Sequence, residues 1–197
     1  MKRLTAKALK AKKVTGVLIP GLILAMALGW SGNELYRTQN YYDNELVFPK
    51  SAVAGGVIDG DNIYLENGQS VRLIGINAPE RGKENFEKAK EKLDSLVTGK
   101  KVWLEYDRTQ DDQFGRIMAW VWVDCEATPE FLPWDYMRLS YNKSRPGLTD
   151  NPEGCKEGKL LNEEMVKAGL AEVLNFKGRG ELKYEARIRY VFRHIKR

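Results

Sequence analysis

The segment VAGGVIDGDNIYLENGQSVRLIGINAPE, residues 53–80, carries the pattern that decides the fold. Apolar residues alternate with other residues on both sides of Asn67-Gly68, a dipeptide typical of a tight hairpin in which both turn positions adopt positive φ. Pro79 then ends the pattern. We therefore expect three strands, near residues 52–58, 62–66 and 70–76.

Two further strands and three helices are expected downstream. Apolar residues at helical spacing predict a helix over residues 84–98, and apolar runs predict strands at 101–106 and 116–124. Asn162 is expected to cap a short helix that ends at Gly169. This order of elements predicts an α+β fold, a five-stranded OB-fold β-barrel of the Greek-key type with three packed helices.

The last of these helices, over residues 181–196, is basic. Its packed face is expected to hold Leu182, Ala186, Tyr190 and Ile195. Its arginines, Arg187 and Arg189 among them, could attract a nucleic-acid backbone, or they could simply be solvated.

The N-terminal region predicts an export element over residues 1–33. Six basic residues among the first thirteen precede a run of 20 uncharged residues from Val14 to Asn33, which as a helix would reach roughly 30 Å, enough to cross a bilayer. The basic leader places the rest of the chain outside the cytoplasm. An uncleaved membrane anchor, a signal peptide cleaved after Ala25-Met26-Ala27 and a buried core helix are the alternatives. The first two predict a domain at the outer face of the cell membrane or a secreted one.

Composition excludes several classes of enzyme. The 197 residues include one histidine, His194, and two cysteines, and they contain no GxxxxGK[ST] run. A His- or Cys-rich zinc site, a convincing Ser-His-Asp triad and a P-loop are therefore excluded. The net charge of +5 comes from the two ends, because residues 14–176 carry a net charge of −7. Hydrolytic chemistry would have to use carboxylates, arginines and an oxygen-ligated cation.

A spacer over residues 34–50 precedes the expected domain at 51–197, which contains a proline-rich insertion at 125–159. Cys125 and Cys155 bracket this insertion, and two cysteines in an exported domain favour a disulfide over two buried thiols. Aromatic residues within the insertion could stack on bases or form a small core of their own; they are Phe131, Trp134, Tyr136 and Tyr141.

Several charged residues stand where a barrel would otherwise be apolar or tightly turned. Arg72 lies within VRLIGI and Arg116 follows Gly115, while Asp59 and Asp61 flank a glycine. Glu80 follows a proline. Each has an ordinary explanation, as an edge-strand residue, a turn or a solvated acid. Together they supply two guanidinium groups for phosphate oxygens, a carboxylate pair for a cation and an acid for water.

These residues belong to longer motifs that resemble the staphylococcal nuclease (thermonuclease) family. The resemblance covers roughly residues 52–124 and 160–176, in the family's order. It rests on VIDGDN (57–62), RLIGINAPE (72–80), FGR (114–116) and LNEEMVKAGLA (161–171). The family implies an OB-fold, Ca²⁺-dependent phosphodiesterase of DNA and RNA that cleaves the 5′ P–O bond and leaves 3′-phosphates.

The resemblance also implies a role for each matching residue. Asp61 would be the main Ca²⁺ ligand, with Asn77 and the backbone carbonyl of Ala78, and Asp59 would act through water or hydrogen bonds. The catalytic set is Arg72 and Arg116, which would clamp the phosphate, and Glu80, which would orient or deprotonate water.

Three features depart from the family pattern. Asn77 stands where the family usually has a second carboxylate, so Ca²⁺ should bind more weakly. Gln113-Phe114 replaces a Lys-Tyr pair, and the insertion at 125–159 has no counterpart. Because of Asn77, there is an alternative function: the domain is a catalytically weakened one that binds nucleic acid or protein at the cell surface. The expected partner is DNA or RNA, together with the membrane if the leader is uncleaved; no protein partner can be inferred.

Overall fold

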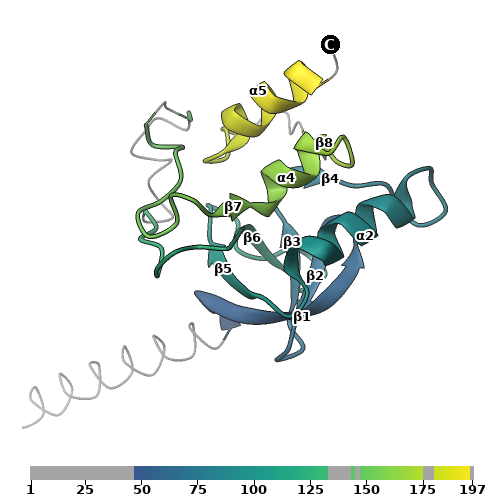
Figure 1. Cartoon of the computed structure of the whole chain (residues 1–197), viewed down its shortest axis with the longest axis horizontal. Coiled ribbons are helices and arrows are strands. Elements are labelled where there is room, and N and C mark those ends of the chain that lie inside the picture. Colours follow the sequence, from purple (N-terminus) through teal and green to yellow (C-terminus); the bar gives the residue numbers. More distant parts are fainter. Residues whose placement is uncertain (1–46, 133–142, 145–146, 175–179, 196–197) are drawn as a thin grey trace, which may run out of the picture. The chain divides into compact units, whose positions relative to one another are not determined.

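Five strands close into a barrel, and three helices pack on it (Figure 1). The computed structural model describes residues 47–132, 143–144, 147–174 and 180–195. The strands are β1 (Ser51–Asp59), β2 (Asn62–Leu65), β3 (Ser70–Leu73), β4 (Ile76–Asn77), β5 (Lys101–Glu105), β6 (Ile117–Val123), β7 (Lys159–Leu160) and β8 (Glu172–Val173). The helices are α2 (Phe86–Val97), α4 (Leu161–Lys167) and α5 (Glu185–Ile195).

The barrel closes through one parallel pairing. The strands follow the order β3-β2-β1-β5-β6, and β3 then pairs with β6 in parallel, with Arg72 opposite Met118. The predicted α+β class and OB-like five-stranded barrel with three helices are therefore confirmed. The short strand β7 pairs with the end of β6 in antiparallel orientation, and β4 pairs with β8 in a separate two-stranded sheet.

The expected N-terminal hydrophobic helix lies outside the described residues, as does nearly all of the spacer at 34–50. Within the described part of the chain, we find no helix with the length and apolar character needed to span a membrane.

The first hairpin is present, but its turn differs from the predicted one. Gly68 has a φ of 86°, whereas the described non-glycine residues with positive φ are Asn85 and Asp124 and do not include Asn67. The Leu65 N–H donates to the Gln69 carbonyl at 2.8 Å, and Gly68 donates back to the Leu65 carbonyl at 2.9 Å. The prediction that both Asn67 and Gly68 adopt positive φ is therefore wrong, because the turn is longer than two residues.

The third predicted strand, 70–76, is broken before its end. Gly75 has a φ of 82°, which glycine adopts at little cost, so the chain turns there instead of continuing in β3. A Cβ at this position would lie 3.0 Å from the Trp120 ring. The chain resumes as β4, in which Asn77 stands opposite Glu172 of β8. This turn carries Asn77 and the residues after it to the side of the barrel where Asp61 lies.

The helices α2 and α4 cover the core. The buried face of α2 presents Phe86, Ala89, Leu93 and Val97. The prediction that Asn162 caps α4 is wrong, because Leu160 is the N-cap residue and the side chain of Asn162 is fully buried. Asn162 accepts from the Val121 N–H at 3.0 Å and donates to the Ile74 carbonyl at 2.8 Å. Its amide therefore ties α4 to β6 and to the turn after β3.

Buried charges anchor the segment that leads into α5. Lys183 forms an ion pair with Glu105, which also accepts hydrogen bonds from Trp122 Nε1 at 3.0 Å and from the Tyr184 hydroxyl at 2.9 Å. Glu105 and Lys183 are 1% and 5% exposed. Asp107 accepts from the Lys183 N–H at 2.7 Å. These contacts fix the chain entering α5 to the end of β5.

The predicted packing face of the terminal helix is largely wrong. Leu182 is buried, but Ala186, Tyr190 and Ile195 are exposed. The buried residues of α5 are Glu185 and Ile188, and Val191 and Phe192 pack against the core beside Ile188, so the packed face follows the helical spacing of these three apolar residues.

A disulfide joins Cys125 and Cys155 at the base of the insertion. Of the four aromatic residues for which stacking was considered, Phe131 packs against the core, and the other three lie outside the described residues. The later part of the insertion contacts α5, because the Thr149 carbonyl and Asn151 Oδ1 accept from Arg187 at 3.1 and 2.9 Å.

Arg187 also binds α4. It forms an ion pair with Glu163 at 2.6 Å, so it is directed at protein groups rather than at solvent. Burial raises the pKa of Glu163, but Arg187 and Lys167 lower it by more, and the result is a pKa below the usual 4.5.

We expect this interaction to make stability depend on pH. A carboxyl group whose pKa is lower in the folded state stabilises the fold above its unfolded pKa and loses that contribution as pH falls. The free energy of unfolding of Glu163→Gln should therefore lie about 1–3 kcal/mol below that of wild type at pH 7, and the gap should close below about pH 4.5. Urea titrations at several pH values measure it. Glu164→Gln, which loses only a contact with Lys167, is the control; a gap that persists unchanged at pH 3 contradicts the assignment.

Candidate functional site

The turn between β1 and β2 places two carboxylates at one end of the barrel. A Cβ on Gly60 would lie 2.6 Å from both the Ala78 and the Ala89 Cβ atoms, so only glycine allows this turn to approach α2 and the loop after β4 so closely. Asp61 is 5% exposed, and one of its carboxylate oxygens accepts from the Ala78 N–H at 2.5 Å. The close approach therefore brings Asp61 and the segment around Ala78 together.

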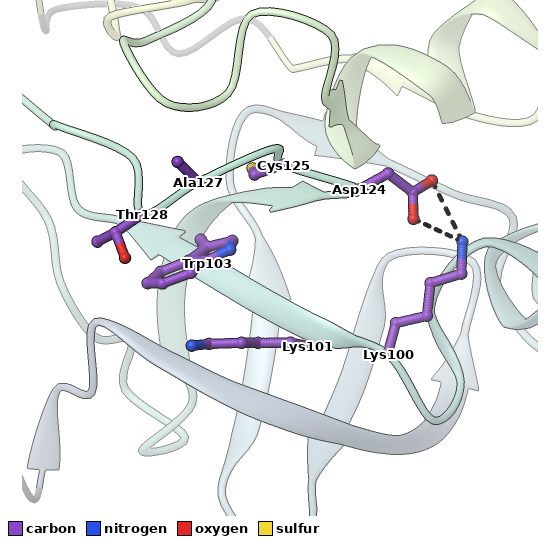
Figure 2. Close-up of a pocket in the computed structure, with 7 residues that line it drawn as sticks. All are labelled: Lys100, Lys101, Trp103, Asp124, Cys125, Ala127 and Thr128. Carbon is purple, nitrogen blue, oxygen red and sulfur yellow. Dashed lines mark hydrogen bonds and ion pairs between the residues drawn. The ribbon is translucent and has the colours of Figure 1, made fainter.

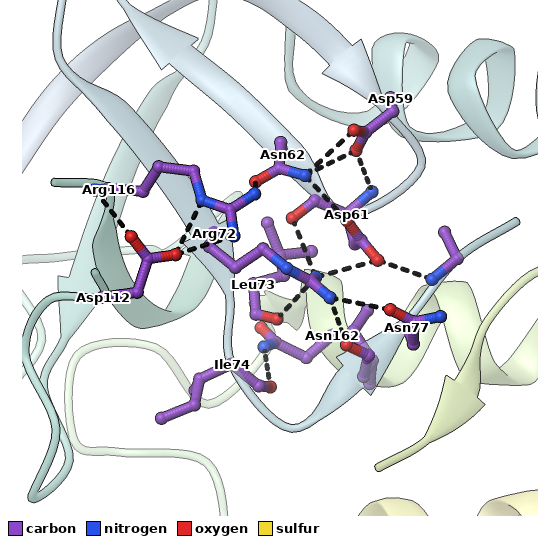
Figure 3. Close-up of polar contacts among 12 residues, drawn as sticks. Asp59, Asp61, Asn62, Arg72, Leu73, Ile74, Asn77, Asp112, Arg116 and Asn162 are labelled. Atoms are coloured by element: carbon purple, nitrogen blue, oxygen red, sulfur yellow. Dashed lines mark hydrogen bonds and ion pairs between the residues drawn. The ribbon is translucent and has the colours of Figure 1, made fainter. Parts of the chain in front are cut away.

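Arg72 connects the two predicted metal ligands (Figure 3). Its Nη1 lies 2.8 Å from Asp61 Oδ2, and its Nη2 donates to Asn77 Oδ1 at 3.1 Å. The same guanidinium donates to the backbone carbonyls of Ile76 at 3.0 Å and Leu73 at 3.3 Å. Arg72 projects from β3 to the end of the barrel, so its charge is placed between a carboxylate and an amide oxygen.

Arg116 approaches the same cluster from the start of β6. Its Nε and Nη2 both lie 2.7 Å from Asp112 Oδ2, which holds the guanidinium in one orientation. Its Nη1 donates to Asn62 Oδ1 at 3.0 Å. The backbone N–H groups of Phe114 and Arg116 donate to Asp112 Oδ1 at 2.9 and 3.1 Å, and these hydrogen bonds fix the loop itself.

Asn62 is the central residue of the cluster, and the sequence analysis assigns no role to it. Its Nδ2 donates to Asp61 Oδ1 at 2.8 Å and to the two oxygens of Asp59 at 2.8 and 3.0 Å, while its Oδ1 accepts from Arg116. The side chain is 4% exposed. The amide therefore links both carboxylates to Arg116. A polar residue at the first position of an otherwise apolar strand was the signal that could have indicated it.

The ionisation of Asp61 reflects this setting. Burial raises the pKa of Asp61, Arg72 and the Ala78 N–H lower it, and the nearby Asp59 raises it; the result is a pKa of about 7. A cation bound at this carboxylate would favour its ionised form.

Glu80 is placed differently from the other predicted residues. It is exposed, and within the described residues its side chain makes no hydrogen bond or ion pair. It lies three residues beyond Asn77, on the loop that follows β4. The structure thus joins Asp59, Asp61, Asn77, Arg72 and Arg116 in one network through Asn62, and leaves Glu80 outside that network.

The oxygen atoms of the cluster suit a hard cation. Within the described residues there is no group of three or more His, Cys, Asp and Glu side chains that could hold a metal. Ca²⁺, however, also accepts amide and backbone carbonyl oxygens. The carboxylate of Asp61, the amide oxygen of Asn77 and the backbone next to them are such a donor set, and the donors come from segments that already touch. The residues present therefore fit a calcium ion.

A larger pocket, of about 510 Å³, lies at the other end of β6 and contains none of the predicted site residues apart from Cys125 (Figure 2). One of its two lysines faces an acid, because Lys100 Nζ donates to both oxygens of Asp124 at 2.9 and 3.2 Å. Lys101 lies over the ring of Trp103 at 4.0 Å. This pocket lacks the paired arginines and carboxylates of the cluster, which remains the candidate active site.

The fold and the cluster together define an OB-like barrel with a carboxylate and arginine site at the β1–β2 turn. The family model described as "Staphylococcal nuclease homologue" matches residues 70–194, and the chain belongs to this family.

Among its relatives, the "Thermonuclease" of Staphylococcus hyicus is 36% identical over 85 residues, which cover 39% of this chain and 50% of the relative. The "Thermonuclease" of Staphylococcus intermedius is 42% identical over 79 residues, covering 36% of this chain and 47% of the relative. An "Uncharacterized endonuclease" of Escherichia coli is 35% identical over 111 residues, covering 52% of this chain and 71% of the relative. The chain spans about half the length of the two thermonucleases.

Proposed function

We propose that the protein is a Ca²⁺-dependent nuclease that hydrolyses phosphodiester bonds of DNA or RNA with low sequence specificity. The observation that carries the proposal is a single network in which Arg72 contacts the Asp61 carboxylate directly and Arg116 is linked to it through Asn62. Two guanidinium groups can bind phosphate oxygens in a bidentate manner, and the carboxylate provides a cation ligand. Membership of a family with nuclease relatives supports the same conclusion.

The calcium ion would be held by Asp61, Asn77 and the backbone carbonyl of Ala78, with Asp59 acting through water or hydrogen bonds. When bound, it would supply an electrophile for the phosphate oxygens. Arg72 Nη1 lies 2.8 Å from Asp61 Oδ2, so a phosphate bound by Arg72 would lie close to the carboxylate that would hold the ion.

The residues of the site would then have different roles in the reaction. Arg72 and Arg116 would bind the scissile phosphate and offset the negative charge that grows in the transition state. Glu80, whose exposed side chain makes no hydrogen bond or ion pair with the part of the chain that the structure describes, would orient or deprotonate the attacking water. Attack of the water oxygen on phosphorus would break the bond to the 5′ oxygen, giving a 5′-hydroxyl and a 3′-phosphate.

We also propose that the domain is exported, either anchored by residues 1–33 or secreted. The basic leader and the 20 uncharged residues after it support export. Sequencing the N-terminus of the mature protein would distinguish the two forms, because a cleaved signal removes the leader.

The proposed activity is tested with the full chain and single-stranded DNA, with calcium and then with excess chelator. We expect cleavage with calcium, its loss with chelator, and products that carry 3′-phosphates and become extendable by a polymerase only after phosphatase treatment. No cleavage over a wide range of calcium concentrations contradicts the proposal.

Asn77 distinguishes the enzyme from the alternative, a weakened domain that only binds nucleic acid or protein. Asn77→Asp adds a carboxylate to the donor set, so the calcium concentration for half-maximal cleavage should fall on the order of tenfold. Calcium titrations of both proteins measure it. If wild type does not cleave and Asn77→Asp does, the binding module is the correct function.

Asn62→Ala should lower the cleavage rate by roughly tenfold to a hundredfold. The substitution removes the amide that positions Arg116 against Asp61, and small displacements of reacting groups have large effects on rate. Asn67→Ala, at an exposed turn outside the cluster, is the control and should stay within about twofold of wild type. Equal rates for the two variants would contradict a positioning role for Asn62.

A further inference from the structure

A second pocket, of about 260 Å³, adjoins the cluster on the side away from Arg116. Residues 77–79, Asn85 and residues 169–172 line it, so it shares Asn77 and Ala78 with the candidate active site. The pairing of β4 with β8, with Asn77 opposite Glu172, brings its two walls together. A molecule bound at the cluster is therefore within reach of this pocket.

The lining of this pocket suits a neutral group. Ala78 and Ala171 are each 4% exposed, and Pro79 and Leu170 are half-buried. The polar lining residues are Asn77, Asn85 and Glu172, and no lysine or arginine is among them. A phosphate would find no positive charge here, in contrast to the two arginines of the cluster. Apolar walls with a few polar groups are typical of pockets that bind planar organic groups.

Asn85 provides a polar group that the protein does not use. It precedes α2 in a left-handed conformation, with a φ of 63°, and its side chain does not cap the helix. Within the described residues this half-buried amide makes no hydrogen bond. An amide offers both a donor and an acceptor, which is what the edge of a nucleobase can pair with.

We propose that this pocket binds the nucleobase of a nucleotide next to the scissile phosphate, an inference that rests on the nuclease function proposed above. A nucleic-acid strand alternates charged phosphates with neutral, flat bases. Here a site with two arginines is followed directly by a site without a cation, with apolar walls and one unused amide. The substrate strand would place its phosphate against Arg72 and Arg116 and turn an adjacent base into the pocket.

The test uses the full chain with calcium and a short single-stranded oligonucleotide whose cleavage is resolved bond by bond. In a series of substrates, each nucleotide in turn is made abasic. We expect one position next to the cleaved bond at which loss of the base lowers kcat/KM roughly tenfold for wild type. Two variants change the pocket: Leu170→Trp fills it, and Asn85→Gly removes the amide. Both should cleave the intact substrate with the roughly tenfold lower kcat/KM that wild type shows on the abasic one. Loss of the base should then have little further effect on either variant.

Two variants are used so that the proposal is still tested if one of them does not fold. Glycine tolerates the φ of residue 85, so Asn85→Gly should fold even if Leu170→Trp does not. Leu148→Trp, an exposed leucine outside the pocket, is the matched control and should behave as wild type. If both variants keep the full dependence on the base, or if wild type shows none, the base does not bind in this pocket. If wild type cleaves no substrate, the nuclease proposal itself fails.

Discussion

Arg72→Lys is expected to lower the rate of calcium-dependent cleavage by at least about a hundredfold. The guanidinium contacts the side chains of Asp61 and Asn77 and three backbone carbonyls through two different nitrogens, and a lysine offers one ammonium in place of this fork. Arg116→Lys should have an effect of similar size, because both Nε and Nη2 are oriented by Asp112. Single-turnover rates at saturating calcium measure the effect.

The control for these variants is Arg189→Lys, an arginine of α5 paired with Glu185 and outside the cluster. It should cleave within about twofold of wild type. Thermal melts of all three proteins separate a loss of chemistry from a loss of fold. A rate for Arg72→Lys within about threefold of wild type would mean that Arg72 does not bind the phosphate in the transition state.

Lys183→Met is expected to lower the free energy of unfolding by about 3–5 kcal/mol. It removes the positive partner of Glu105, which is 1% exposed and would remain as an uncompensated buried charge. The hydrogen bonds from Trp122 and Tyr184 would compensate for only part of this cost. Urea unfolding at pH 7 gives the measurement.

The matched control is Lys100→Met, which breaks an ion pair with Asp124 whose side chains are 42% and 36% exposed. Such surface pairs contribute about 0–1 kcal/mol, so this variant should unfold close to wild type. If both variants lose the same stability, the buried pair does not anchor the C-terminal segment to the barrel.

The barrel could be predicted because its signals are local. Alternation around Asn67-Gly68, the helical spacing from Phe86 to Val97 and the motif residues Asp61 and Arg72 each act within a short stretch of chain. The candidate site could be located for the same reason: its residues are sited on turns and strand ends that these local patterns fix.

The features that were missed depend on contacts distant in sequence. Asn162 resembles an N-cap residue, but its partners are 88 and 41 residues away, and only the folded barrel offers them. Lys183 and Glu105 are 78 residues apart, so nothing local predicts the buried pair that anchors the chain before α5. Asn62 likewise gains its role only when β6 brings Arg116 to it.

The most direct test is a crystal of the full chain grown with calcium, in which anomalous scattering locates the ion. The proposed function predicts one calcium ion with an oxygen of the Asp61 carboxylate at about 2.3–2.6 Å, and with Asn77 and the Ala78 carbonyl among its ligands. Calcium bound elsewhere, or none near Asp61 in a protein that cleaves DNA with calcium in solution, would contradict the account.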